Sequence, residues 1–194
     1  MAVRRARTKD EIVAAAWVLA REQGLTALSL RELGSRVGMR AQSLYSYFPS
    51  KHAIYDAMFR QGYEQYLALD PVEIDDAAGD AGVRRAALDG AVQFFDFCTS
   101  DPVRHQLLFQ RVVPGFEPST ASYALALEAY ERGVGKLRTH GITDGAGLDL
   151  FTAVITGLVD QQLSNDPGGT RWRRLLEPAV DMLLDHITRR TIPS

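Results

Sequence analysis

Apolar residues recur at the spacing of an α-helix along almost the whole chain, and no stretch alternates with the period of a β-strand. Thr8 and Glu11 have the spacing of a capping box, which predicts that a first helix begins at Thr8. Ser29 and Glu32 repeat this spacing ahead of a short second helix, which Gly38 ends. The pattern therefore predicts an all-α fold of about nine helices.

Capping and helix-breaking residues divide the rest of the chain into further helices. Ser50 and Asp144 are suitable N-caps, and the segments 70–82 and 166–169 are rich in residues that favour loops. The predicted helices cover residues 41–48, 51–69, 83–99, 102–112, 119–139, 145–164 and 171–190.

A tight turn at Gly38 joins two short helices, which is the arrangement of a helix-turn-helix when another helix supports the pair. Residues 1–51 hold nine Lys/Arg and four Asp/Glu, so this segment carries +5 and the remainder −7. This asymmetry suits a protein that contacts a polyanion with one end, although solvated surface charge is an alternative explanation. We predict a helix-turn-helix DNA-binding domain at residues 1–52, followed by a second helical domain at residues 53–194.

The sequence has no pattern typical of an enzyme, a metal site or a membrane span. The four histidines are scattered, Cys98 is the one cysteine, and no nucleophile motif or phosphate-binding glycine loop is present. Asp160 with Asp181 or Asp185 is a candidate metal cluster, but solvated or capping carboxylates explain these residues better. No apolar run reaches the roughly 18 residues that a span needs. We expect a cytoplasmic protein without catalytic residues, metal, cofactor or membrane partner.

The run VGMRAQSLYSYFPSKHAIYDAMF at residues 37–59 resembles the signature of the tetracycline-repressor (TetR) family of bacterial regulators. The preceding run GLTALSLRELGSRVG also matches, so the resemblance covers about residues 8–60. It implies an N-terminal helix-turn-helix that binds a double-stranded DNA operator. The DNA contacts that it implies are Arg31, Arg40, Ala41, Gln42, Ser43, Tyr45, Ser46, Tyr47 and Lys51.

By the same resemblance, Arg31 reaches a phosphate or a guanine edge, and Arg40, Ala41 and Gln42 face bases. The phosphate contacts that it implies are Ser43, Tyr45, Tyr47 and Lys51. Ser46 departs from the family, since many relatives carry a larger side chain there. Alternative interpretations are a core aromatic for Tyr45 and solvated charges for Arg31 and Arg40. Residues 4–7, with Arg4, Arg5 and Arg7, form either an arm in the minor groove or, as we prefer, a disordered tail.

Recognition of two DNA half-sites requires a homodimer with two-fold symmetry. The two last long helices have wide apolar faces, and Gly157 is expected to permit close helix approach. The alternative is that these faces only close the core of one chain. The predicted interface consists of Phe151, Ile155, Leu158, Gln162, Leu176, Val180, Leu183 and Leu184.

Aromatic residues are dense in the middle helices, where the family places an effector cavity; plain core packing is the alternative. The candidate pocket residues are Phe94, Phe97, Cys98, Phe109, Phe116, Tyr123 and Tyr130. The predicted function is a repressor that a small apolar or aromatic effector releases from a palindromic operator, through a shift of the helix at 51–69. The alternatives are a regulator without small-molecule control and an activator.

Overall fold

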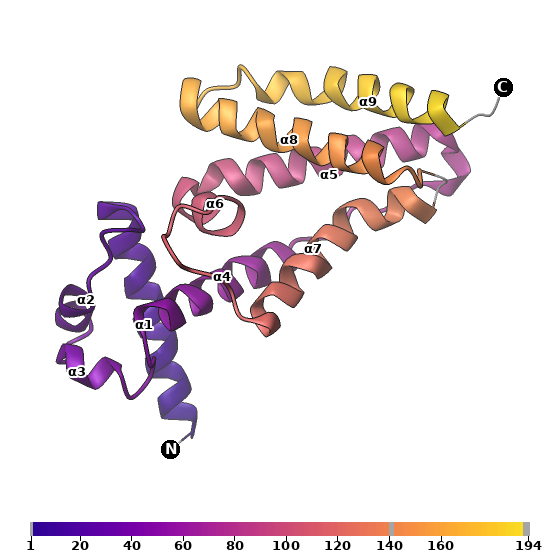
Figure 1. Cartoon of the computed structure of the whole chain (residues 1–194). Coiled ribbons are helices and arrows are strands. Elements are labelled where there is room, and N and C mark those ends of the chain that lie inside the picture. The colour runs from indigo at the N-terminus through magenta and orange to yellow at the C-terminus, as the bar shows by residue number, and fades with distance from the viewer. Residues whose placement is uncertain (1, 140–141, 192–194) are drawn as a thin grey trace. The chain divides into compact units, whose positions relative to one another are not determined.

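A computed structural model describes residues 2–139 and 142–191, which form nine α-helices, two 3₁₀ segments and no strand (Figure 1). The predicted all-α fold is confirmed. The α-helices are α1 (Ala2–Gln23), α2 (Leu30–Arg36), α3 (Ala41–Leu44), α4 (Lys51–Leu67), α5 (Asp80–Ser100), α6 (Pro102–Phe109), α7 (Thr120–Thr139), α8 (Gly145–Asn165) and α9 (Leu176–Thr191). The 3₁₀ segments are η1 (Asp76–Ala78) and η2 (Arg173–Leu175). Among the described residues, no helix combines the length and the apolar character that crossing a bilayer requires.

The chain forms two compact units that do not follow the order of the sequence. The first unit comprises Met1–Ala68 and Val103–Leu127, and the second comprises Leu69–Pro102 and Glu128–Ser194. Helix α4 therefore belongs to the same compact unit as α1–α3, and α7 begins in the first unit and ends in the second. The functional boundary at residue 52 stays a prediction, because compactness alone does not separate DNA binding from other roles.

Helix α1 is longer than the capping box predicted. It begins at Ala2 rather than Thr8, because the preceding residues are mostly alanine and arginine, which are good helix formers. Arg7 Nε donates to Glu11 Oε1 at 3.1 Å, one turn away on the same helix. The backbone of residues 4–7 is thus helical rather than a disordered tail, whereas the side chains of Arg4 and Arg5 lie outside the described residues.

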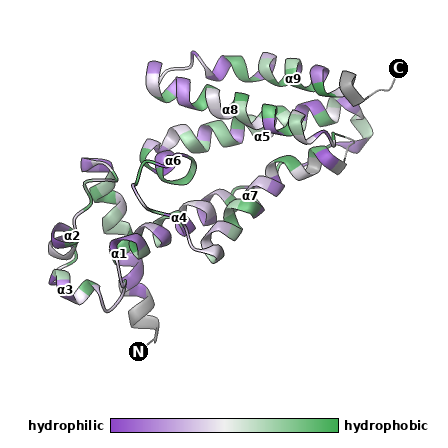
Figure 2. Cartoon of the chain, in the orientation of Figure 1, coloured by the Kyte–Doolittle hydropathy of each residue, from purple (hydrophilic) through white to green (hydrophobic). Residues whose placement is uncertain are grey.

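The second unit is built on α5, α8 and α9, which pack against one another. Hydrophobic residues recur along these helices with polar residues between them (Figure 2). Close approach of α8 and α9 occurs at Gly147, where a Cβ would lie 2.8 Å from Cγ1 of Ile187. A Cβ at Gly157 would meet nothing within 4 Å inside the chain, so the close helix approach expected there for a dimer stays a prediction.

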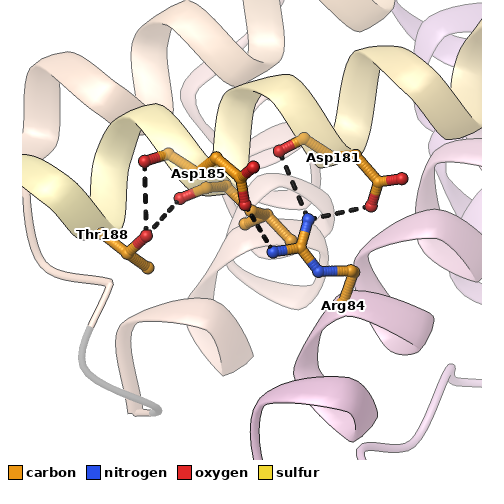
Figure 3. Close-up of polar contacts among 5 residues, drawn as sticks. Arg84, Asp181, Asp185 and Thr188 are labelled. Atoms are coloured by element: carbon orange, nitrogen blue, oxygen red, sulfur yellow. Dashed lines mark hydrogen bonds and ion pairs between the residues drawn. The ribbon is translucent and has the colours of Figure 1, made fainter.

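An arginine on α5 holds α9 through two carboxylates (Figure 3). Arg84 Nη1 donates to Asp181 Oδ1 at 2.8 Å, and Arg84 Nη2 donates to Asp185 Oδ1 at 2.7 Å. The hydrogen bond to Asp181, and then that to Asp185, raise the pKa of the Arg84 guanidinium above its ordinary value. These two aspartates are therefore ion-pair partners, and no cluster of metal-ligating side chains occurs in the part of the chain that the structure describes.

Replacement of Arg84 by alanine is expected to lower the free energy of unfolding by about 1 kcal/mol, because water screens this partly exposed network. Arg85→Ala is the matched control, since the Arg85 guanidinium forms its ion pair with Asp89 on its own helix and its side chain is 75% exposed. Denaturant unfolding measures both. Equal stability of Arg84→Ala and Arg85→Ala would mean that the ion pairs do not hold α9 to α5.

Candidate nucleic-acid interface

Helices α2 and α3 meet through a turn that two glycines make possible. Gly38 has φ +68°, a left-handed conformation that side chains rarely adopt, and Met39 N donates to Gly34 O at 2.8 Å. At Gly34 a Cβ would lie 2.8 Å from Met39 O and 3.1 Å from Ala41 N, so the backbone of the turn approaches α2 directly. The predicted helix-turn-helix geometry therefore depends on backbone contact at Gly34, which the sequence analysis did not single out.

Helix α3 is one turn long and is followed by a turn at residues 45–47, whereas the prediction extended it to residue 48. Leu44 and Phe48 are buried in the core of the first unit, together with Leu33 of α2. Because Phe48 N donates to Leu44 O at 2.9 Å, the chain continues in a helix-like path beyond the end of α3. The two buried side chains fix which side of this segment faces outward.

The outward side of this segment is polar. Arg40, Gln42, Ser43 and Ser46 are exposed, and the side chain of Tyr45 is 54% exposed, so the core-aromatic alternative for Tyr45 is wrong. We refer to these five residues as the reading surface. Leu44 and Phe48 of the same segment are buried, so the five exposed side chains form a row of hydrogen-bonding groups on its outward side.

Other predicted contact residues lie differently. Ala41 and Tyr47 are half-buried, and the Tyr47 ring packs against the core. Ser46 Oγ donates to Ser43 O at 2.7 Å, so its proton already has an acceptor. Arg31 is exposed on α2. Arg36, on the same helix, instead binds both Glu22 carboxylate oxygens of α1, and this hydrogen bonding lowers the pKa of Glu22.

Two α4 side chains hold the loop that leads into α2. Lys51 Nζ donates to Thr26 O at 3.2 Å and lies 5.5 Å from the centre of the Tyr55 ring. Tyr55 is fully buried, and its hydroxyl donates to Leu25 O. Burial lowers the pKa of Lys51 and raises the pKa of Tyr55 to about 12. The sequence analysis missed Tyr55, because an apolar helix position does not reveal that a hydroxyl meets a loop carbonyl.

The seven candidate pocket residues do not belong to one unit. Phe94, Phe97, Cys98 and Tyr130 are in the second unit, whereas Phe109, Phe116 and Tyr123 are in the first. Rings of the first unit contact the Phe116 ring, whose centroid lies 5.7 Å from that of Tyr55. The ring of Phe109 lies 5.8 Å from that of Tyr63, and Tyr123 is half exposed. The effector pocket stays a prediction, because the seven candidate residues are divided between the two units.

Most of the predicted dimer residues are buried inside the second unit of one chain. This applies to Phe151, Ile155, Gln162, Leu176, Val180, Leu183 and Leu184. Gln162 accepts a hydrogen bond from Trp172 N at 3.1 Å and donates to Asp166 Oδ2 at 3.2 Å, so it fixes the α8–η2 connection. These seven residues pack in the core of one chain, which is the alternative interpretation given above. Little of their surface remains to contact a second copy. Leu158 alone of the set is partly exposed.

A second set of mostly apolar residues on α8, η2 and α9 is exposed or partly exposed. Leu150 is 43% exposed and Met182 60% exposed. The residues share a stripe at helical spacing on each helix, and we call the two stripes the outer face. It consists of Leu150, Ala153, Val154, Gly157, Leu158 and Gln161 from α8, with Leu175 of η2 and Ala179 and Met182 from α9.

A family model described as bacterial regulatory proteins of the tetR family matches residues 12–58, which include the reading surface and the start of α4. This segment is therefore similar to the DNA-binding segment of TetR-family regulators. The chain is 27% identical to the HTH-type transcriptional repressor Rv1353c of Mycobacterium tuberculosis, over 93% of its own length and 70% of the relative. The HTH-type transcriptional regulator Mb1388c of Mycobacterium bovis aligns with the same identity and coverage. As predicted, the protein is a transcriptional regulator.

Solved structures agree with the architecture. The regulatory protein SCO4313 has a TM-score of 0.71 at 22% identity, over 95% of this chain and 98% of that one. A TetR variant from Acinetobacter baumannii AYE, solved in complex with minocycline, has a TM-score of 0.64 at 19% identity with the same coverage. At such identities the likeness concerns the fold.

Gly34→Ala is expected to destabilise the first unit. Overpacking against backbone atoms costs about 1–3 kcal/mol, which outweighs the roughly 1 kcal/mol that alanine gains in a helix. Gly90→Ala is the matched control, because a Cβ at Gly90 of α5 meets nothing within 4 Å and should leave stability unchanged or raised. Thermal unfolding compares the two. A Gly34→Ala protein as stable as Gly90→Ala would contradict the close approach of the turn.

Proposed function

We propose that the reading surface enters the major groove of duplex DNA. The observation that carries this proposal is the polar, exposed side of residues 40–46 on a support anchored by buried Leu44 and Phe48. A short helix with such a side can present hydrogen-bonding groups to base edges. The positive charge of residues 1–51 supplies the attraction to phosphates.

The individual roles follow from exposure and chemistry. Gln42 and Arg40 contact bases, Ala41 offers a methyl group, and Arg31 contacts a phosphate or a guanine edge. The phosphate contacts are made by Ser43, Tyr45, Tyr47 and Lys51. Lys51 has one of its three N–H donors at Thr26 O, which leaves donors for a phosphate oxygen. Ser46 contributes least, since its proton is bound to Ser43 O.

Gln42→Ala and Lys51→Ala separate the two kinds of contact. Loss of Gln42 should cost about 1–3 kcal/mol on the preferred duplex and relax preference at one base position. Loss of Lys51 should weaken binding to all sequences alike and reduce the salt slope by about one unit. Binding titrations over a range of salt concentrations and base substitutions measure both effects. A uniform loss for Gln42→Ala would argue against base recognition, and an unchanged slope for Lys51→Ala would argue against a phosphate contact.

We further infer that the active form is a homodimer whose contact is the outer face. Two reading surfaces about 34 Å apart are needed to bind two half-sites, and a two-fold axis supplies them. An exposed apolar stripe on two adjacent helices suits a second copy of the same surface, because each stripe lacks charged side chains.

Met182→Glu is expected to produce monomers, because two-fold symmetry places both new charges in one apolar contact. Leu127→Glu is the control, since Leu127 is comparably exposed, at 52% against 60% for Met182, but lies on α7 outside the outer face. Sedimentation equilibrium measures the dimer dissociation constant of each variant. A dimer dissociation constant of Met182→Glu no higher than that of Leu127→Glu would refute this interface.

We propose that the protein is a repressor whose operator binding responds to a small apolar or aromatic effector. The similarity to a repressor and to a TetR variant solved with minocycline supports this proposal. A thermal-shift screen of aromatic compounds, followed by operator titrations with each compound that binds, tests it. Compounds that bind without ever altering operator affinity would favour the alternative, a regulator without small-molecule control.

A further inference from the structure

Ser119, the residue before α7, is hydrogen-bonded to Asp56 near the start of α4. The Asp56 carboxylate accepts hydrogen bonds from Ser119 N at 2.7 Å and from Ser119 Oγ at 3.0 Å. Ser119 Oγ also accepts from Ser122 N at 3.2 Å and lies 3.1 Å from the hydroxyl of Ser122, which is fully buried. Ser119 therefore both caps α7 and binds Asp56. We call Asp56, Ser119 and Ser122 together the latch.

The latch lies next to the contacts that hold the helix-turn-helix. Asp56 directly follows Tyr55, whose hydroxyl donates to Leu25 O in the loop before α2. The ring of Phe116, three residues before Ser119, lies 5.7 Å from the Tyr55 ring and 6.3 Å from the Phe59 ring. A displacement of the start of α7 therefore acts on the α4 turn that positions the loop leading to α2.

Helix α7 also reaches the far end of α4. The helix is continuous from Thr120 to Thr139, so its second half belongs to the second unit. There Arg132 donates to the carbonyl of Leu69, two residues after the end of α4. One helix therefore contacts α4 near its start and the chain just beyond its end.

We propose that α7, in addition to α4, couples the second unit to the reading surface, and that Asp56 is the positioning residue through which α7 acts. The proposal rests on the proposed DNA-binding function. Coupling between sites is reciprocal, so DNA bound at the reading surface must change the stability of α7 as much as a change in α7 alters DNA binding. An operator duplex can therefore replace the unidentified effector as the probe.

The experiment is hydrogen exchange of the full chain with and without a duplex selected from random sequence. In the wild type, the duplex should protect amides of residues 41–47 and also amides of α7. In Asp56→Ala the protection at 41–47 should remain and that of α7 should be lost, because Ser119 still caps α7 but no longer holds α4. Operator affinity should fall by about 2- to 30-fold, the usual range for residues that couple sites.

Asp75→Ala is the matched control, because Asp75 likewise accepts a backbone N–H, from Ala77 at 3.0 Å, but contacts neither α4 nor α7 through that bond. Asp56→Asn keeps an acceptor and should retain most of the affinity. Ser119→Ala, which keeps the N–H and removes the hydroxyl, should show a partial loss and serves if Asp56→Ala does not fold.

Protection at 41–47 without protection of α7 in the wild type would overturn the proposal and leave the DNA-binding function intact. Equal protection of α7 in Asp56→Ala and the wild type would also overturn it. Absence of protection at 41–47 with every duplex would instead remove the proposed function, and the proposal with it.

Discussion

The direct backbone contact between α2 and the turn before α3 is the constraint on which the proposed function depends. A Cβ at position 34 would lie 2.8 Å from the carbonyl oxygen of Met39, so only glycine fits there. This close contact fixes the separation of α2 from the turn before α3. Burial of Leu33, Leu44 and Phe48 then leaves one orientation for the segment between them. The exposed row of polar groups follows from this packing, because every apolar side chain of the segment except Tyr45 already faces inward or is partly covered.

Helix α4 extends the same rigid support. Its side chains bind the loop before α2 through Tyr55 and Lys51, and Trp17 Nε1 of α1 donates to Gln61 Oε1 at 2.8 Å. These bonds tie α4 to the helix-turn-helix at several points along its length. The compact unit that contains the reading surface therefore includes α4.

Periodicity and capping predicted the fold class, most helices and the exposed polar side chains of α3. They did not separate the buried side of α8 from its exposed side, because α8 is apolar on two adjacent sides. Spacing alone does not tell Phe151 and Ile155, which are buried, from Leu150 and Val154, which are not. The close approach at Gly147 was missed in the same way, since the sequence around this glycine does not reveal that Ile187 of α9 packs against it. Hydrogen bonds such as that of Tyr55 to Leu25 O join residues thirty positions apart and leave no local pattern.

Selection of bound sequences from random duplexes at low ionic strength tests the central claim most directly, because it requires no knowledge of the operator or effector. An exposed reading surface on a two-fold dimer predicts an inverted repeat whose half-sites lie about one helical turn apart. Recovery of no enriched sequence, or binding that is equally strong for every duplex, would contradict the account that residues 40–46 recognise bases.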